Sequence, residues 1–350
     1  MAFRCRMTDK SSLESTLTRA WLRRGPIACA LWPLSLLFRA LAALRVRLYR
    51  AGLLKSERLP VPVIVVGNIF IGGTGKTPLT IWLAEALRAA GFTPGVISRG
   101  HGREGESPRA VTVISEAREV GDEPLLIARR ARCPVVVGRQ RAAAGRALLA
   151  AYPQVDVLIA DDGLQHYALR RDIEVVLFDG RGVGNGWLLP AGPLREPPAR
   201  KRDFTVVNTP ELTPALAAAV GGHAFRMHLA GQFAERLARP GERVPLAQLA
   251  GRRIVAAAGI GNPSRFFATL RAAGLAFDEL PLPDHHDFLD QPFAALDADV
   301  ILITEKDAVK CAQLENLNND PRLWVVPVTA QIDAALAEQI VEKCRGRSTA

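Results

Sequence analysis

Cysteines, aromatic side chains and long apolar runs are all scarce in this sequence. Its five cysteines lie far apart and without C-x-x-C spacing, which argues against a disulfide framework and a zinc site and fits a reducing cytosol. The apolar stretch at residues 25–38 contains Pro26 and Pro33 and is 14 residues long, whereas a bilayer-spanning helix needs about 20 apolar residues. We therefore expect neither a disulfide-rich secreted domain nor a membrane-spanning segment.

Acidic residues are nearly absent from the first 50 positions. That segment carries ten lysines and arginines against Asp9 and Glu14, so it holds +8 of the net charge of +10. A basic surplus confined to one arm points to a partner of that arm and not to a groove in the rest of the chain. Because the arm lacks aromatic or groove-reading patterns, we expect no nucleic-acid partner. No feature points to an obligatory protein partner.

Leucines at helical spacing follow within the basic arm. Leu34, Leu37, Phe38, Leu41, Leu44 and Leu48 share one face, opposite Arg39, Arg47 and Arg50. We expect residues 1–50 to form a basic, amphipathic, membrane-associated helical segment whose arginines meet anionic lipid headgroups. The alternative is a helix whose apolar stripe packs on the next domain.

The remaining composition is ordinary for a soluble α/β protein, and 350 residues suffice for two domains. Between residues 63 and 207, strand-like apolar runs alternate with helical patterns, which predicts a parallel sheet covered by helices on both faces. Residues 211–245 are richer in Pro, Gly and Ala and suggest a hinge region. We expect a domain at 51–225 built on the parallel sheet, and a second, smaller α/β domain at 226–350.

Four β-branched residues at 63–66 precede a glycine-rich turn and a helical pattern. The turn contains Gly72, Gly73 and Gly75 and ends in Lys76-Thr77. This order points several backbone N–H groups at one place, with the positive end of the helix dipole behind them. It predicts a phosphate-binding loop (P-loop) in which Lys76 neutralises phosphate charge and the Thr77 hydroxyl holds Mg²⁺.

Phe70 departs from the pattern G-x-x-x-x-G-K-[ST], because it stands where the first glycine belongs. The alternative to a phosphate site is a glycine-rich turn with no ligand. Three glycines directly before Lys-Thr are hard to explain by turn geometry alone.

Asp161 and Asp162 follow the apolar run at 157–160, the usual form of the acidic strand that completes a P-loop metal site. Alone, the two acids would be read as caps of the next turn. Because the loop is present, we expect one carboxylate in the Mg²⁺ shell and the other orienting water or the Thr77 hydroxyl.

Two further groups are candidates for proton transfer. Asp122 lies at an expected helix start, where capping is a sufficient explanation, but phosphoryl transfer to a hydroxyl also needs a carboxylate as proton acceptor. His285 belongs to the polar stretch Asp284-His285-His286-Asp287, whose plain alternative is a surface loop. A histidine paired with a carboxylate across a domain cleft is the functional interpretation.

Together these motifs resemble the tetraacyldisaccharide 4′-kinase family of bacterial lipid A biosynthesis. The resemblance covers nearly the whole chain. It rests on Gly67-Asn68, Gly72–Pro78, Ser98-Arg99-Gly100, Gly102-Arg103, Gly121–Pro124, Asp161–His166, Leu189–Glu196, Asp284-His285 and Thr304–Ala308. That family also lacks the first P-loop glycine. His101 departs from the tyrosine usual at its position.

The resemblance implies transfer of the γ-phosphoryl group of ATP to the 4′-hydroxyl of a tetraacyldisaccharide 1-phosphate, the lipid A precursor, forming lipid IVA. The protein would be peripheral, on the cytoplasmic face of the bacterial inner membrane. Asp122 would be the base, supported by His285. Lys76, Arg195 and Arg141 would complete the catalytic set, and Glu123 would join Thr77, Asp161 and Asp162 at Mg²⁺. The expected nucleotide contacts are Phe70, Ile71, Gly72, Gly73, Thr74, Gly75, Lys76, Thr77 and Gln165.

The alternative function is a membrane-recruited P-loop switch ATPase of the partitioning type. Such proteins begin the loop with lysine, where this chain has Ile71. Asp284-His285-His286 would have no role in a switch.

Overall fold

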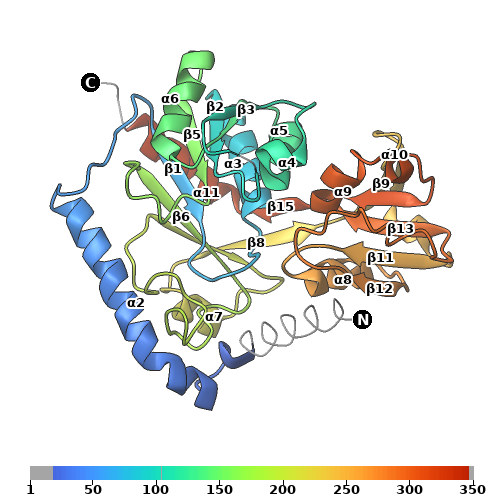
Figure 1. The fold of residues 1–350 in the computed structure, drawn as a ribbon, viewed down its shortest axis with the longest axis horizontal. Coiled ribbons are helices and arrows are strands. Elements are labelled where there is room, and N and C mark those ends of the chain that lie inside the picture. The colour runs from blue at the N-terminus through green and yellow to red at the C-terminus, as the bar shows by residue number, and fades with distance from the viewer. Residues whose placement is uncertain (1–18, 104, 347–350) are drawn as a thin grey trace.

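The computed structural model describes residues 19–103 and 105–346, and the chain in it is built on two sheets (Figure 1). The larger sheet has nine strands in the order β15-β8-β7-β6-β1-β5-β2-β4-β3. Its strands are β1 (Val63–Gly67), β2 (Pro94–Ser98), β3 (Arg109–Val111), β4 (Val135–Val137), β5 (Val157–Asp161), β6 (Ile173–Asp179), β7 (Phe204–Asn208), β8 (Phe225–Ala230) and β15 (Thr329–Ile332). The edge strands β3 and β15 pair antiparallel and the rest parallel.

The smaller sheet has six strands in the order β10-β9-β14-β13-β11-β12. They are β9 (Phe233–Arg236), β10 (Arg243–Pro245), β11 (Ile254–Ala258), β12 (Asp278–Pro281), β13 (Val300–Thr304) and β14 (Leu323–Val326). The helices are α2 (Pro26–Arg50), α3 (Lys76–Ala89), α4 (Ala117–Val120), α5 (Asp122–Ala131), α6 (Arg141–Ala151), α7 (Pro214–Ala219), the 3₁₀ helix η1 (Leu246–Leu249), α8 (Pro263–Ala272), α9 (Glu305–Cys311), α10 (Glu315–Asn318) and α11 (Ala334–Arg345).

Side chains alternate between the two faces of the larger sheet, as the period of a strand requires. Ile64 and Val66 of β1 pack in a core with α3, α5 and α11 on one face. Val63 and Val65 pack on the opposite face with α6 and the segment around Leu188. The α/β class, with a P-loop sheet and a second, smaller α/β unit, is therefore confirmed.

Two stretches differ from the sequence expectation. Residues 211–245, expected as a hinge region, contain α7, β8, β9 and β10, and the chain passes from the larger to the smaller sheet between β8 and β9. Residues 329–345 lie within the expected domain 226–350, yet β15 pairs with β8 of the larger sheet and α11 packs against α3. The chain thus crosses between the two units twice.

The N-terminal helix is longer than the leucine pattern indicated. It begins at Pro26 instead of Leu34 and continues through Pro33, so its length is about 37 Å at 1.5 Å per residue. By length and composition alone it is apolar enough to cross a membrane. The charge-free stretch of 14 residues underestimated the length of this helix. The stretch stops at Arg39, the first charged residue, whereas the helix continues to Arg50.

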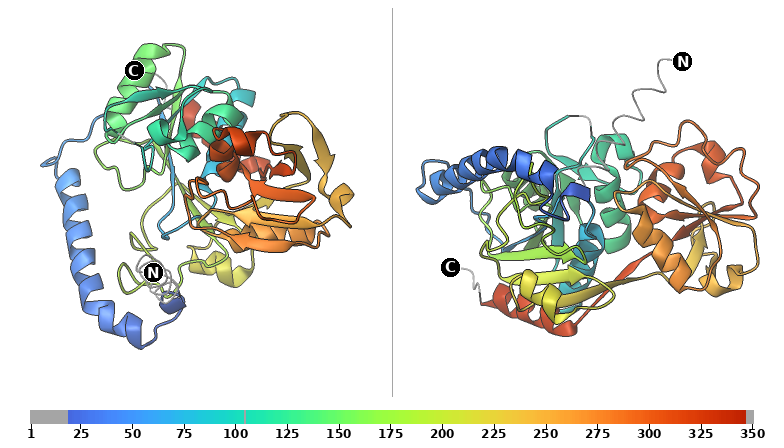
Figure 2. Two further views of the ribbon diagram at one scale, coloured as in Figure 1. Left: turned by 45° about the vertical axis from the view of Figure 1, so that its right-hand side comes forward. Right: turned by 90° about the horizontal axis from the view of Figure 1, so that it is seen from below.

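One face of α2 packs on the larger unit, and the helix runs along the outside of that unit, away from the smaller sheet (Figure 2). Ala28 and Ser35 are buried, Phe38 packs on the core, and the Ser35 hydroxyl donates to the Leu188 carbonyl at 2.8 Å. The adjacent face is exposed and apolar: Ile27, Leu34, Leu37, Leu41 and Leu44. The basic residues before position 19 lie outside the described residues.

Candidate active site

The P-loop follows β1, the central strand of its sheet, and α3 begins directly after it. Gly72 and Gly75 have φ angles of 99° and 102°, a region that favours glycine. A Cβ on Gly75 would also lie 2.6 Å from Asn208 Nδ2 at the end of β7. The glycines therefore allow both the backbone path and the close packing of the loop against a neighbouring strand end.

Lys76 is held at the base of the loop. Its Nζ donates to Asn68 Oδ1 at 3.3 Å and lies 3.7 Å from Asp162 Oδ1. Asn68 in turn donates through Nδ2 to the carbonyls of Phe70 and Gly72. One buried amide thus fixes both the glycine turn and the lysine.

Asp161 ends β5 and is 1% exposed. Thr80 Oγ1 donates to its Oδ1 at 3.2 Å, and Ser98 Oγ, from the end of β2, donates to its Oδ2 at 3.1 Å. Burial, together with the charges of Glu123 and Asp162, raises the pKa of Asp161 to about 6. Three carboxylates close enough to repel one another are typical of a site that a cation stabilises.

Asp162 is the carboxylate of the pair with an open position. Among the described residues, nothing donates a hydrogen bond to its buried Oδ1, while Arg195 Nη1 lies 3.7 Å from its Oδ2. Burial alone would raise the pKa of Asp162, but Lys76 and Arg195 outweigh it and keep the pKa low. Thr77 lines the same cavity as Asp161 and Asp162, and carboxylate and hydroxyl oxygens are the donors that Mg²⁺ prefers, so these residues fit that ion.

The Asp122 carboxylate meets the imidazole of His285 across the two units. Asp122 begins α5 and is 3% exposed, and its Oδ2 is 3.0 Å from His285 Nδ1. The Glu123 N–H donates to its Oδ1. Although burial opposes ionisation, the hydrogen bond to His285 and the charges of Lys306 and Lys310 place the pKa of Asp122 well below its usual range.

His285 has a raised pKa, chiefly because of its hydrogen bond to Asp122. Its Nε2 faces Lys306 Nζ at 3.3 Å, and its ring lies 5.4 Å from that of His101. Lys306 Nζ is also 3.5 Å from Glu123 and 3.2 Å from Asp284. The lysine therefore links acids from both units around the Asp122–His285 pair.

A cavity of about 590 Å³ lies between the two units and joins the loop to that pair. The following residues proposed from the sequence line it: Gly72, Gly73, Thr74, Gly75, Lys76, Thr77, Asp122, Glu123, Asp161, Asp162, Gln165, Arg195 and His285. The structure thus brings together residues separated by more than 200 positions in the chain.

Phe70, Ile71 and Arg141 lie behind this lining. Phe70 is buried and bridges to Leu194, and the Ile71 N–H donates to the Pro193 carbonyl. Arg141 is 2% exposed and donates through Nη1 to the Gly138 carbonyl. Burial lowers its pKa to about 10, while Asp161 and Asp162 act in the opposite direction.

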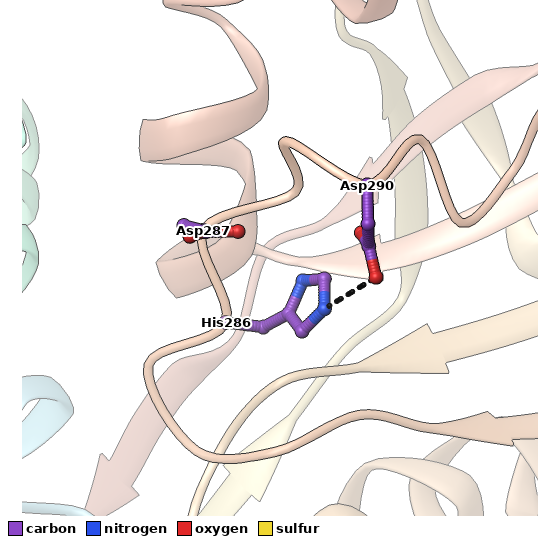
Figure 3. Close-up of side chains that lie close together, drawn as sticks. All are labelled: His286, Asp287 and Asp290. Atoms are coloured by element: carbon purple, nitrogen blue, oxygen red, sulfur yellow. Dashed lines mark ion pairs between the residues drawn. The ribbon is translucent and has the colours of Figure 1, made fainter. Parts of the chain in front are cut away.

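His286, Asp287 and Asp290 form a second polar cluster (Figure 3), and none of the three lines the cavity. His286 Nδ1 accepts the Phe288 N–H, and Nε2 lies 3.5 Å from Asp290 Oδ2. Because Nδ1 accepts, a neutral ring carries its proton on Nε2 and has no free lone pair for a metal. Asp287 accepts the Leu289 N–H, so the cluster is explained as loop structure.

Three residues of the site were not proposed from the sequence. Lys306 follows the end of β13, and Arg265 lies one turn beyond the glycine-rich end of β11. Asn208 ends β7 and donates to the Thr74 carbonyl at 2.9 Å. The rule that ligands gather at the carboxyl ends of parallel strands would have found Asn208 and Lys306, but not Arg265, which lies inside α8.

A mostly parallel sheet that carries this loop and an acid pair, with a carboxylate–histidine pair formed across the two units in the same cavity, defines a phosphotransferase of the P-loop class. The family described as tetraacyldisaccharide-1-P 4′-kinase matches residues 27–345. The chain belongs to that family, whose reaction is a phosphoryl transfer in lipid A biosynthesis.

Known relatives align with this chain over nearly its full length. The tetraacyldisaccharide 4′-kinases of Herminiimonas arsenicoxydans and Janthinobacterium sp. (strain Marseille) are 64% and 63% identical, each over 98% of this chain and 99% of the relative. The crystal structure of the Aquifex aeolicus LpxK, in complex with ATP, has a TM-score of 0.74 at 29% identity and covers 90% of this chain and 99% of its own. The family membership leaves no support for the switch ATPase.

Proposed function

We propose that this protein transfers the γ-phosphoryl group of ATP to the 4′-hydroxyl of a tetraacyldisaccharide 1-phosphate and so forms lipid IVA. The observation that carries the proposal is the single cavity that contains both the P-loop and the Asp122–His285 pair. One end of such a cavity serves a phosphate donor and the other an acceptor hydroxyl, as a kinase requires. The names of the relatives, and the ATP in complex with the Aquifex aeolicus LpxK, support the same reaction.

At the donor end, the loop N–H groups and Lys76 would hold the β- and γ-phosphates. The Thr77 hydroxyl and Asp162 would hold Mg²⁺, with Asp161 and Glu123 in the same cavity; the buried Asp162 Oδ1, to which no described residue donates a hydrogen bond, supports this assignment. When bound, Mg²⁺ would neutralise charge on the phosphates. Arg195, 3.7 Å from Asp162, is placed to add positive charge where the transferring group develops negative charge. Gln165 is held by Glu196 at 2.9 Å and faces the same cavity.

At the acceptor end, the Asp122–His285 pair would take the proton of the 4′-hydroxyl. Asp122 is ionised because of its lowered pKa, and it fixes the imidazole through Nδ1. The raised pKa of His285 lets the pair hold the proton once the hydroxyl oxygen has bonded to phosphorus. The two residues would therefore act as one base.

The acceptor is a lipid, so the protein must reach a membrane, and α2 is the element suited to this. Its exposed apolar stripe, Leu34 to Leu44, is free to enter the lipid interface. Its other face packs on the larger unit through Ala28, Ser35 and Phe38, which favours a helix lying along the membrane over one surrounded by lipid. We propose peripheral association with the cytoplasmic face of the inner membrane.

The decisive experiment mixes the purified protein with γ-labelled ATP, Mg²⁺ and a tetraacyldisaccharide 1-phosphate in mixed micelles. We expect label in the lipid at the 4′-position and none when the acceptor lacks the 4′-hydroxyl. ATP hydrolysis at an undiminished rate without lipid, and no labelled lipid, would instead favour a switch ATPase.

A further inference from the structure

Arg265 of α8, which belongs to the smaller unit, reaches across the cavity to the P-loop. Its Nη1 donates to the Thr74 carbonyl at 3.2 Å and its Nη2 to Asp179 Oδ2 at 3.1 Å. Asp179 ends β6 of the larger sheet and is 1% exposed. One guanidinium therefore joins the smaller unit to both the loop and the end of a core strand of the larger unit.

Asp179 is a fixed anchor for this arginine. Arg181 binds it through two parallel hydrogen bonds, from Nε to Oδ1 at 3.0 Å and from Nη2 to Oδ2 at 2.7 Å. Arg181 itself packs over the Phe70 ring, with 4.1 Å between its Cζ and the ring centroid. Because Arg181 fixes the Asp179 carboxylate, the hydrogen bond from Arg265 Nη2 to Asp179 also fixes the guanidinium plane. Arg265 Nη1 is thereby directed toward the Thr74 carbonyl.

The Thr74 carbonyl accepts two hydrogen bonds, one from Arg265 and one from Asn208 Nδ2 at 2.9 Å. In a planar trans peptide the C=O and the following N–H point in opposite directions. The two donors therefore also fix the Gly75 N–H, and they direct it away from themselves. Gly75 is the N-cap residue of α3, and a helix N-terminus presents its unpaired N–H groups to an anion.

We propose that Arg265 is a positioning residue for phosphoryl transfer: it orients the Thr74–Gly75 peptide and so aims the Gly75 N–H at the donor phosphates. The loop takes this geometry only when α8 is seated against it. Nucleotide affinity thus depends on the smaller unit. The assignment rests on the proposed function only in taking the bound phosphates to be those of ATP.

The test uses Arg265→Lys and Arg265→Ala in the full chain, with Arg271→Ala as the matched control. Arg271 lies on the same helix, but it is exposed and pairs with Glu279 outside the cavity. The readout is the Kd of a fluorescent Mg·ATP analogue, measured without lipid. We expect both Arg265 variants to raise the Kd about tenfold to a hundredfold, the loss expected for a hydrogen bond to a charged group. Arg271→Ala should stay within about twofold, as surface substitutions do.

Lysine at position 265 should not restore nucleotide affinity. A single ammonium group lacks the planar geometry by which the arginine donates to the Thr74 carbonyl and the Asp179 carboxylate at once. A second readout combines Arg265→Ala with Asn208→Ala. Because both side chains act on one carbonyl, their losses should be non-additive, with the double variant far from the product of the two singles.

Three results would overturn the assignment. In the first, Arg265→Lys binds the analogue like the native protein, so that charge alone suffices. In the second, a folded Arg265 variant melts at a lower temperature but binds the analogue with an unchanged Kd, so that the arginine contributes only to the stability of the fold. In the third, the losses of Arg265→Ala and Asn208→Ala multiply. If Arg265→Ala does not fold, Arg265→Lys and Asn208→Ala decide by the same criteria. A native protein that binds the analogue yet never phosphorylates the lipid would reject the proposed function and leave this assignment standing.

Discussion

At the scale of single residues, Lys76 is the cation best placed to meet phosphate charge, since its Nζ lies at the base of the loop beside Asn68 and Asp162. We expect Lys76→Ala to lower kcat by about two to three orders of magnitude, the range found when one preorganised donor to developing charge is removed. Lys201→Ala, on an exposed lysine, is the control. Steady-state kinetics on folded proteins make the measurement, and near-native turnover by Lys76→Ala would remove the loop from the mechanism.

The Asp122–His285 pair can be tested by substituting its two members separately and together, since they come from different units. If they share one proton-transfer task, Asp122→Ala and His285→Ala should each lower kcat strongly with little change in the KM for ATP. The double variant should be scarcely worse than the poorer single variant. His286→Ala, on the neighbouring loop residue, tests whether loop disruption alone has this effect. Losses in kcat that multiply would mean that the two side chains have independent roles.

The same pair predicts how stability depends on pH. The pKa of His285 is higher in the folded protein than the value of about 6.5 in an unfolded chain. Protonated His285 therefore stabilises the fold fully below about pH 6.5, and this contribution is lost as the pH rises through the raised pKa. Asp122 adds no slope in this range because its pKa is lowered and it stays ionised.

Melting temperatures of the native protein and of His285→Asn, measured from pH 5.5 to 8.5, provide the check. The difference between them should be largest at the acidic end and shrink as the pH rises. A difference that is constant across the range, or one that grows with pH, would contradict a stabilising protonated imidazole.

At the scale of elements, α2 has two faces with separate tasks. Leu37→Glu and Leu41→Glu, on the exposed stripe, should weaken binding to anionic vesicles at every salt concentration, because they remove apolar area. Arg39→Glu with Arg47→Glu should weaken it mainly at low salt, since exposed charges are screened. Leu289→Glu changes an exposed leucine far along the chain and is the control. Cosedimentation with vesicles measures all three. Undiminished binding by the leucine variants would make α2 a packing element only.

The elements also differ in how well the sequence predicted them. The apolar runs at 63–66 and 157–160 predicted β1 and β5 to within one residue of their observed limits, because fully buried strands are unbroken apolar runs. β8, β9 and β15 were missed because each mixes half-buried and buried positions over four to six residues, with exposed positions as well in β8 and β15, which gives no clear period. The start of α2 was placed too late because the leucine pattern begins at Leu34, whereas the helix begins at Pro26 and continues through Pro33.

Site residues that belong to a local sequence motif could be predicted. Site residues whose role depends on contacts with residues distant in the sequence could not. Lys76, Asp161 and Asp162 follow strand ends in a recognisable order. Arg265 has no local signal, because its acceptors lie 191 and 86 positions away and meet it only when two sheets pack together. Tertiary geometry alone distinguishes such an arginine from a solvated one.

At the scale of the whole molecule, the cavity makes nucleotide binding a property of both units. Its lining includes Lys76 and Asp161 from the larger unit and Arg265, His285 and Lys306 from the smaller. A ligand bound there should stabilise both sheets, since opening either unit would release it. At one hundred times its Kd, it stabilises the native state by about 2.7 kcal/mol.

At an unfolding entropy of about 2.1 cal/mol/K per residue, a chain of 350 residues gains about 1.4 °C per kcal/mol, so Mg·ATP should raise the melting temperature by about 4 °C. Calorimetry with and without Mg·ATP makes the measurement, and hydrogen exchange then reports on each sheet separately. We expect slower exchange in β11 and β13 of the smaller sheet as well as in β1 and β5. Lys76→Ala, at the same ligand concentration, should lose most of both effects, because the ligand loses its main cationic contact. If protection is confined to the larger sheet while the smaller sheet exchanges as before, the two units do not close on the nucleotide together.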